Sequence, residues 1–69
     1  MGDPRLASRL KEARQAAELT QAELAEKAGV SRKTVNTVEN GVFIPSTILA
    51  LSLARALGVT VEELFWLAD

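Results

Sequence analysis

Residues 20–41, TQAELAEKAGVSRKTVNTVENG, decide the fold of this chain. Thr20 and Glu23 have the spacing of a capping box, in which each side chain accepts a hydrogen bond from the backbone N–H of the other residue. A helix should therefore begin after Thr20 and end at Gly29, because glycine adopts the left-handed conformation that terminates helices. Ser31 can cap a second helix only two residues later. The stretch predicts two short helices joined by a tight turn.

Such a pair, over about residues 20–40, has the layout of a helix-turn-helix unit, whose second helix lies in the major groove of DNA. One arc of the second helix, about 140° wide, collects polar and basic side chains and no acid: Arg32, Lys33, Asn36, Thr37 and Asn40. Arginine and lysine can donate to guanine, asparagine can pair with adenine, and a threonine methyl can contact thymine. This composition favours DNA contact over a merely solvated helix face.

The opposite faces of the two helices should pack inside the protein. In the first helix, the residues expected to face inward are Ala22, Leu24, Ala25 and Ala28. In the second, the packed side should comprise Ser31, Thr34, Val35 and Val38. This division into an outward polar arc and an inward apolar side is the pattern of an amphipathic helix.

Three more helices are expected around this unit. Apolar residues recur at helical spacing before it, at Leu6, Leu10, Ala13 and Ala17, which predicts a helix over residues 5–17. After it, Ser46 can cap an almost uniformly apolar helix that ends at Gly58 and should lie at the centre. A second capping-box pair, Thr60 and Glu63, predicts a last helix over residues 61–67. Because strand signals are absent, the expected fold is all-α, a compact bundle of five helices.

The composition restricts the chemistry. At 69 residues the chain has room for one domain, residues 1–69. It has no Cys and no His, which excludes disulfides, thiolate or imidazole zinc sites, cysteine nucleophiles and histidine bases. We therefore expect a protein that is not an enzyme and that needs no metal or cofactor. No small-molecule ligand is evident from the sequence.

The location and the charge distribution can also be inferred. Residues 47–57, the longest strongly apolar stretch, include Ser52 and Arg55 and fall far short of the ~20 residues that a membrane span needs. Because the N-terminus lacks an apolar signal region, we expect a cytoplasmic protein without a membrane partner. The net charge is -1, but seven of the eight basic residues lie within residues 1–40, where the helix-turn-helix unit lies. A DNA partner is compatible with this placement.

Residues 20–41 resemble the helix-turn-helix of the phage repressor and Cro (Xre-type) family. The likeness continues through Pro45-Ser46 and residues 54–59 to Glu63-Leu64-Phe65, and it therefore spans nearly the whole chain. It implies the lambda-repressor-like DNA-binding fold, and it is closest to the short bacterial transcriptional regulators that consist of this domain alone.

The resemblance also implies roles for single residues. The residues at base-contacting positions are Arg32, Lys33, Asn36 and Thr37, and those at phosphate-contacting positions are Gln21, Ser31 and Asn40. Gln21 would in addition brace the recognition helix, although a solvent-facing role at the helix start is the alternative. Arg14 and Glu39 would form a partly buried ion pair with a structural role.

The loop after the recognition helix departs from the family pattern. Many relatives have a basic residue directly after the glycine, where this chain has Val42, Phe43 and Ile44. Contact of this loop with a phosphate would therefore depend on backbone N–H groups. Phe43 is expected to anchor the core or the loop, and a role as a wedge in DNA is the less favoured alternative.

The C-terminal segment, Leu64-Phe65-Trp66-Leu67, has two adjacent aromatic rings. On a helix these rings would point about 100° apart, so only one of them could face inward fully. An exposed tryptophan is typical of an interface, and the family commonly dimerises through this end. The expected homodimer interface comprises Val61, Leu64, Phe65 and Trp66. The alternative is a tryptophan folded back on its own domain.

These inferences lead to one functional hypothesis and one rival. We expect a sequence-specific DNA-binding transcriptional regulator, a repressor that binds a pseudo-palindromic operator as a homodimer. Its partners would be double-stranded DNA and a second copy of itself. The rival is a protein-interaction module such as the antitoxin of a toxin–antitoxin pair. The aromatic tail fits the rival, but the outward face of the second helix does not.

Overall fold

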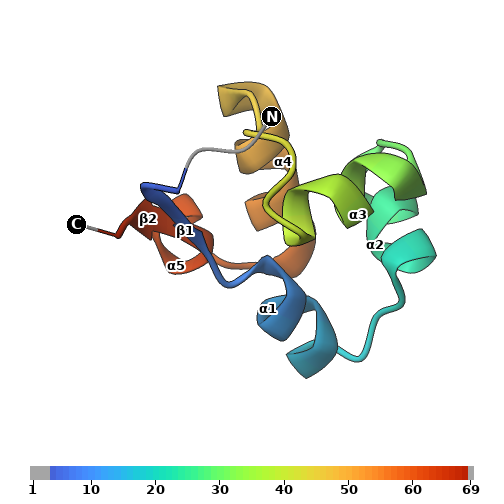
Figure 1. Ribbon diagram of the computed structural model, residues 1–69. Helices are drawn as coiled ribbons and strands as arrows, with labels where there is room; N and C mark the ends of the chain where they lie inside the picture. Colours follow the sequence, from blue (N-terminus) through green and yellow to red (C-terminus); the bar gives the residue numbers. More distant parts are fainter. Residues whose placement is uncertain (1–3, 69) are drawn as a thin grey trace.

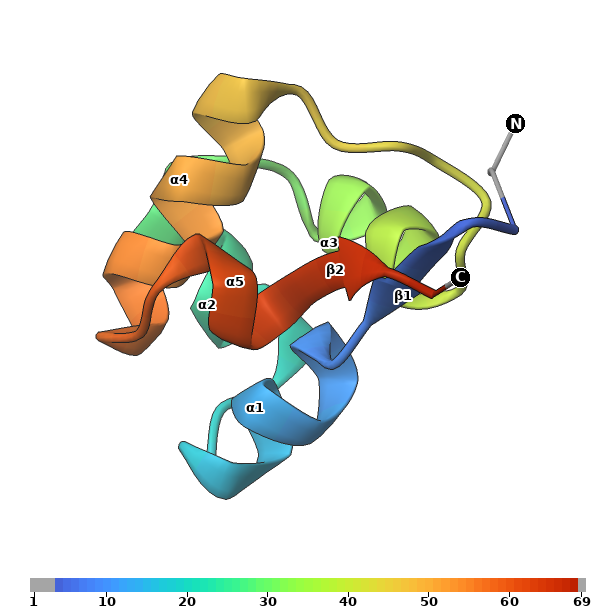
Figure 2. The same cartoon turned by 90° about the vertical axis from the view of Figure 1, so that its left-hand side faces the viewer.

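The computed structural model describes residues 4–68, which form five α-helices and a small antiparallel sheet. The helix α4 lies between the α2–α3 pair on one side and the sheet with α5 on the other (Figure 1). A view from the side shows β1 and β2 lying next to each other although they come from opposite ends of the chain (Figure 2). In chain order the elements are β1 (Leu6–Ser8), α1 (Leu10–Ala16), α2 (Gln21–Ala28), α3 (Arg32–Glu39), α4 (Thr47–Leu57), α5 (Val61–Leu64) and β2 (Phe65–Leu67).

The hydroxyl side chains expected at the helix starts do cap them. At α2 both halves of the capping box form: the Glu23 N–H donates to Thr20 Oγ1 at 3.0 Å, and the Thr20 N–H donates to Glu23 Oε1 at 2.8 Å. Ser31 caps α3 and Ser46 caps α4, each by accepting from the N–H three residues later. At α5, Thr60 accepts from the backbone in the same way, but the Thr60 N–H does not donate to the Glu63 carboxylate. The predicted starts of α2, α3 and α4 are therefore confirmed.

The expectation of an all-α fold is wrong at both ends of the chain. Residues 6–8 are a strand, the first helix begins only at Leu10, and the last helix ends at Leu64. The strands pair in antiparallel register, with Leu6 opposite Leu67, Ala7 opposite Trp66 and Ser8 opposite Phe65. Strands of three residues are too short to show the alternation by which a strand is recognised in a sequence. Their backbone groups find partners only because the fold brings the two ends together.

Most of the predicted apolar faces form the core, with three exceptions. Ala17 and Ala22 are exposed, so neither contributes to the core as expected. The helix α4 is buried on one side only, because Ile48 is 78% exposed and Leu51 is 55% exposed. The prediction of a helix enclosed all round is therefore wrong for its first half. The core consists of Leu10, Leu24, Ala25, Val35, Val38, Leu49, Ala50, Leu53, Ala54, Leu64 and Phe65.

Candidate nucleic-acid interface

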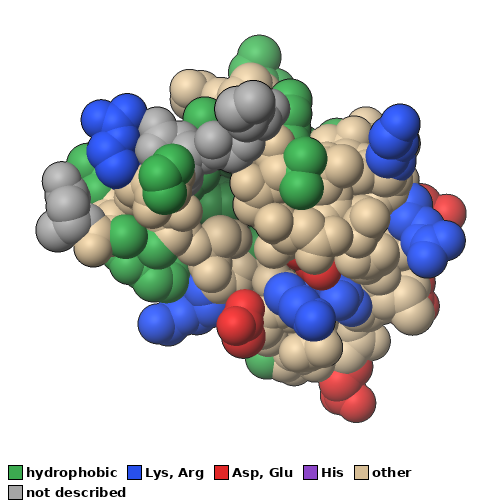
Figure 3. All heavy atoms as spheres, in the orientation of Figure 1, with side chains coloured by type: hydrophobic (Ala, Val, Ile, Leu, Met, Phe, Trp, Pro, Cys, Tyr) green, Lys and Arg blue, Asp and Glu red, His purple; other side chains and the backbone are tan. Residues whose placement is uncertain are grey.

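The helix α3 carries a polar outer face and an apolar inner face. Val35 and Val38 are buried in the core, whereas Arg32, Lys33 and Asn36 are exposed. Basic side chains stand at the right-hand edge of the molecule in Figure 3, where the N-terminal end of α3 lies in Figure 1. Thr37 is half-buried, and Asn40 is exposed just after the helix. Of the residues expected on the packed side, Thr34 is half-buried and Ser31 is exposed.

An ion pair under this face joins α1 to α3. The Arg14 Nε donates to Glu39 Oε2 at 2.6 Å, and Arg14 Nη2 donates to Glu39 Oε1 at 3.2 Å. A third bond, from Arg14 Nη1 to the carbonyl of Leu19 at 2.8 Å, ties in the loop before α2. The Glu39 side chain is only 1% exposed, and its hydrogen bond raises the pKa of the Arg14 guanidinium. Since a buried carboxylate is costly unless it is paired, this contact holds the first three helices together.

Gln21 extends the ion pair to the surface. Its amide Nε2 donates to Glu39 Oε1 at 3.1 Å and to Asn36 Oδ1 at 3.3 Å. Asn36 Oδ1 also accepts from Asn40 Nδ2 at 3.0 Å. A continuous network therefore runs from α1 through the start of α2 to the outer face of α3. The bracing role that the resemblance implied for Gln21 is visible as these two bonds.

The network changes which groups are free for DNA. Both N–H groups of the Gln21 side chain are used inside the protein, so the donors left at the start of α2 are backbone N–H groups of its first turn. Asn36 has its oxygen occupied and keeps its amide N–H groups as donors. The Ser31 hydroxyl caps α3 and shares a hydrogen bond with Thr34 Oγ1 at 2.8 Å. The side chains of Arg32 and Lys33 make no hydrogen bond or ion pair within residues 4–68.

A shallow polar hollow of about 350 Å³ lies between the two helices of the unit. It is lined by Gln21, Arg32, Lys33 and Asn36. The helix N-terminus of α2 and the two cations of α3 give this hollow a positive potential, which suits a phosphate or the acceptor groups of guanine.

Comparison with known proteins agrees with this geometry. A family model described as helix-turn-helix matches residues 10–64. The chain belongs to the Xre-type helix-turn-helix family. The transcriptional regulator YgzD of Bacillus subtilis is 37% identical over 62 residues, which cover 90% of this chain and 94% of YgzD. A helix-turn-helix transcriptional regulator of Methanothermobacter thermautotrophicus is 48% identical over 61 residues, covering 87% of this chain and 88% of the relative.

Solved structures of helix-turn-helix regulators have the same fold. The restriction-modification controller protein C.AhdI of Aeromonas hydrophila superposes with a TM-score of 0.78 at 40% identity, covering 80% of this chain and 83% of C.AhdI. The biofilm regulator SinR, in a crystal structure in complex with DNA, superposes with a TM-score of 0.75 at 31% identity, covering 78% of this chain and 87% of SinR. The fold is therefore that of lambda-repressor-like DNA-binding domains, with a two-stranded sheet added to the helices.

The loop that follows the recognition helix is apolar and exposed. Val42 is 56% exposed and Phe43 is 46% exposed, so of the two expected roles for Phe43, an anchor of the core or of the loop, the first is wrong. The backbone N–H groups of Asn40, Gly41 and Val42 donate to carbonyls of α3. These three N–H groups are thus not free to bind a phosphate, and within residues 4–68 the Phe43 N–H is the one donor of residues 40–43 that has no partner. The expected contact of this loop with a phosphate is therefore narrowed to that group.

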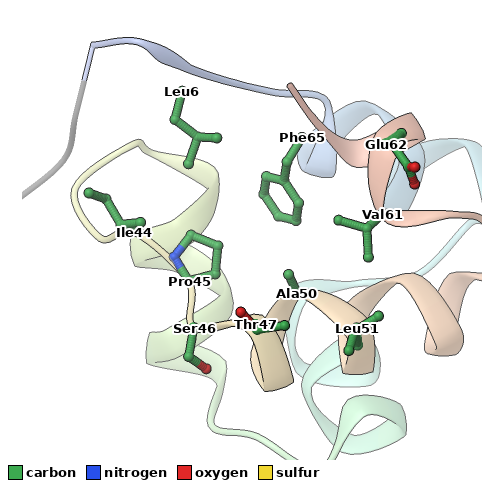
Figure 4. Close-up of a pocket in the computed structure, with 10 residues that line it drawn as sticks. All are labelled: Leu6, Ile44, Pro45, Ser46, Thr47, Ala50, Leu51, Val61, Glu62 and Phe65. Atoms are coloured by element: carbon green, nitrogen blue, oxygen red, sulfur yellow. The ribbon is translucent and has the colours of Figure 1, made fainter. Parts of the chain in front are cut away.

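A second exposed apolar surface surrounds a groove of about 430 Å³ at the start of α4 (Figure 4). Phe65 points into the groove from one side, Ala50 from α4 and Pro45 from the preceding loop (Figure 4). Beside it stand the exposed Ile48 and Leu51. We call this surface the α4 face. Leu6, Ile44, Leu51 and Val61 line its groove, and we include the exposed Ile48 of α4 and Leu67, the strand partner of Leu6.

The residues expected at a dimer interface lie in different environments. Leu64 is fully buried and Phe65 is 8% exposed, so both belong to the core of their own chain. Val61 is half-buried and lines the groove. Trp66 is exposed, but the Arg9 guanidinium lies 5.3 Å from the centre of its ring, as in a cation–π contact. One ring points inward and one outward, as expected, but strand alternation is the cause.

The structure also bears on membranes and metals. No helix within residues 4–68 is long and apolar enough to cross a membrane. Among the same residues, no three acidic side chains gather in a way that would hold a metal ion.

Proposed function

We propose that this helix-turn-helix regulator is a repressor that binds a pseudo-palindromic operator as a homodimer. One observation carries the proposal: the outer side of α3 exposes two cations without a partner beside the hydrogen-bonded amide of Asn36, and the Arg14–Glu39–Gln21 network sets this helix against α2. Groups held in position before binding lose less entropy when they meet base edges. Repression would follow from occupying promoter DNA, and the protein would act in the cytoplasm.

The proposed contacts divide into two kinds. Arg32 and Lys33 would donate to guanine, with Asn36 and Thr37 contacting neighbouring bases. Phosphates would be bound at the start of α2 through backbone N–H groups near Gln21, with Ser31 and Asn40 beside them. Phosphate contacts fix the position of the protein, and base contacts give specificity.

The proposed dimer forms through the α4 face. The exposed Ile48 side chain lies beside the groove on the same surface. Two copies related by a two-fold axis could therefore each place Ile48 in the groove of the other. Val61 and the neighbouring Trp66 would lie within or next to this contact. Two recognition helices in a dimer of this class lie about 34 Å apart, which predicts half-sites ~10 base pairs apart.

The test begins with selection of bound fragments from random DNA. On the selected operator, Arg32→Ala should weaken binding by about 1 to 3 kcal/mol and relax the preference at one base pair. Gln21→Ala should weaken binding to specific and random DNA alike, because it loosens the position of the whole unit. Lys27→Ala, an exposed cation at the far end of α2, is the matched control and should change little.

Two results would contradict the proposal. The first is a loss that is equal on operator and random DNA for both Arg32→Ala and Gln21→Ala. The second is the absence of any selected sequence, together with a protein that stays monomeric. That outcome would favour the rival, an antitoxin-like module whose α4 face binds another protein.

A further inference from the structure

We infer that Val42 and Phe43, in the loop after α3, bind the 5-methyl group of a thymine in the major groove and so determine part of the operator sequence. The inference rests on the proposed function, since it assumes that α3 enters the groove. It adds an apolar contact from outside the recognition helix to the polar contacts along it.

The location of the two side chains carries the inference. A hollow of about 300 Å³ at the surface is lined by Lys33, Thr34, Thr37, Val42 and Phe43. It therefore joins the outer face of α3 directly, and Lys33 also lines the polar hollow on the other side. A base pair next to the one contacted by Lys33 would meet this apolar hollow.

The loop side of the hollow offers few polar groups to DNA. The loop residues Val42, Phe43 and Ile44 carry no charge, and the N–H groups of residues 40–42 are bonded to carbonyls of α3. Thr37 Oγ1 donates to the carbonyl of Thr34 at 3.0 Å, which leaves the Thr37 methyl as an apolar contact group. Of the groups at the major-groove edge of the four bases, the thymine 5-methyl is the only methyl group and the largest apolar one.

The chain supplies a matched control in the next residue. Phe43 and Ile44 are both 46% exposed and are neighbours in the same loop. Phe43 lines the hollow beside α3, whereas Ile44 lines the groove of the α4 face. Both border a small cavity of about 20 Å³ beneath the loop. Truncating either one removes an apolar side chain of equal exposure, but only Phe43 should affect the reading of a methyl group.

The experiment uses the full chain and the operator obtained by selection. Each thymine of one half-site is replaced in turn by uracil, which removes only the methyl group. Binding is measured for the unaltered protein, Phe43→Ala, Phe43→Leu and Ile44→Ala. At one thymine, next to the base pair contacted by Lys33, uracil should weaken binding about four-fold, the value expected for one methyl group removed from an apolar contact. Phe43→Ala should reduce this penalty clearly, with Val42 and the Thr37 methyl left in place, and Phe43→Leu should retain most of it.

Ile44→Ala should retain the full uracil penalty even where it weakens binding by loosening the dimer. An equal uracil penalty in Phe43→Ala and in the unaltered protein would overturn the inference, as would an operator without a sensitive thymine. If Phe43→Ala changes the oligomeric state but keeps the full uracil penalty, the hollow is a contact between two copies of the protein and the inference is overturned. Loss of all operator preference in the unaltered protein would overturn the proposed function itself, so the two failures are distinguishable.

Discussion

The two exposed surfaces of this small domain are built in opposite ways. The outer side of α2 and α3 is polar, and a chain of hydrogen bonds from Arg14 through Glu39 and Gln21 to Asn36 fixes it. The α4 face is apolar, and most of Ile48 and more than half of Leu51 are exposed. One surface is complete before it meets a partner, whereas the other leaves apolar area in water.

The difference indicates how each surface would contribute energy. On the polar surface the network orders Gln21 and Asn36 during folding, so binding to DNA costs further entropy mainly in the side chains of Arg32 and Lys33. On the α4 face the gain comes from removing apolar area from water, and it is realised only when the face is covered. Specificity is therefore expected from the first surface and association from the second.

Breaking the buried ion pair should have the largest effect. Arg14→Ala would leave the Glu39 carboxylate, which is 1% exposed, with only the Gln21 amide as a partner. We expect the free energy of unfolding to fall by about 3 kcal/mol. Urea denaturation at one fixed protein concentration measures it. Lys11→Ala, an exposed cation in the same helix, is the control and should change the unfolding energy little.

A double variant separates stability from positioning. Arg14→Met with Glu39→Leu replaces the pair by apolar side chains and should recover most of the lost unfolding energy. The operator affinity of the double variant should remain below that of the unaltered protein, because Gln21 has lost its bond to Glu39. Full recovery of affinity would show that the network serves the fold alone.

The next largest effect should appear on the α4 face. Ile48→Asp places a charge at its most exposed apolar position and should weaken self-association by about 2 kcal/mol or more. The fold should persist, because this side chain is 78% exposed. Sedimentation equilibrium measures the change. Trp66→Ala should weaken the dimer less, since Arg9 of the same chain already covers the Trp66 ring. If Trp66→Ala weakens self-association more than Ile48→Asp does, the dimer interface lies at the C-terminal aromatic segment and not on the α4 face.

The turn before α2 offers a smaller test on the polar side. Glu18 has a φ of 59°, a left-handed conformation in which any residue other than glycine is strained. Glu18→Gly should raise the free energy of unfolding by up to about 1 kcal/mol, measured by thermal unfolding. Glu12→Gly, within α1, should lower it by about the same amount. A loss of stability in Glu18→Gly would mean that its side chain has a role in the fold.

The smallest effect should be a pH dependence at the start of α2. The backbone N–H and hydroxyl of Thr20 lower the pKa of Glu23 below its ordinary value. A carboxylate whose pKa is lower in the folded state stabilises at pH values above the unfolded pKa, and this contribution is lost as the pH falls through the folded pKa. Glu23→Gln should therefore be less stable than the unaltered protein at neutral pH but approach it below pH ~4, in urea denaturation at several pH values.

Glu63→Gln is the control, because Glu63 makes no return bond to Thr60 in the structure. A constant difference at every pH would contradict the role of the Glu23 charge.

Local rules were sufficient for the helix-turn-helix unit. Thr20, Ser31 and Ser46 cap helices, and Gly29 and Gly58 end them in the left-handed conformation, as expected from residue type and spacing alone. The Arg14–Glu39 pair came from the family resemblance, and no local rule would have found partners 25 residues apart. The bracing by Gln21 was likewise implied by the resemblance, whereas the occupied N–H groups of residues 40–42 followed from neither source.

The sequence by itself determined the helical unit at the centre of the chain and the composition of the outer face of α3, because caps and helical periodicity act over only a few residues. Only the tertiary structure decided that Leu6–Ser8 and Phe65–Leu67 are strands, that Ile48 is exposed, and that Phe43 lies beside Thr37. The physical reason is that strand pairing and burial depend on which distant segments meet. That information is distributed over the whole chain and is not contained in any short stretch of it.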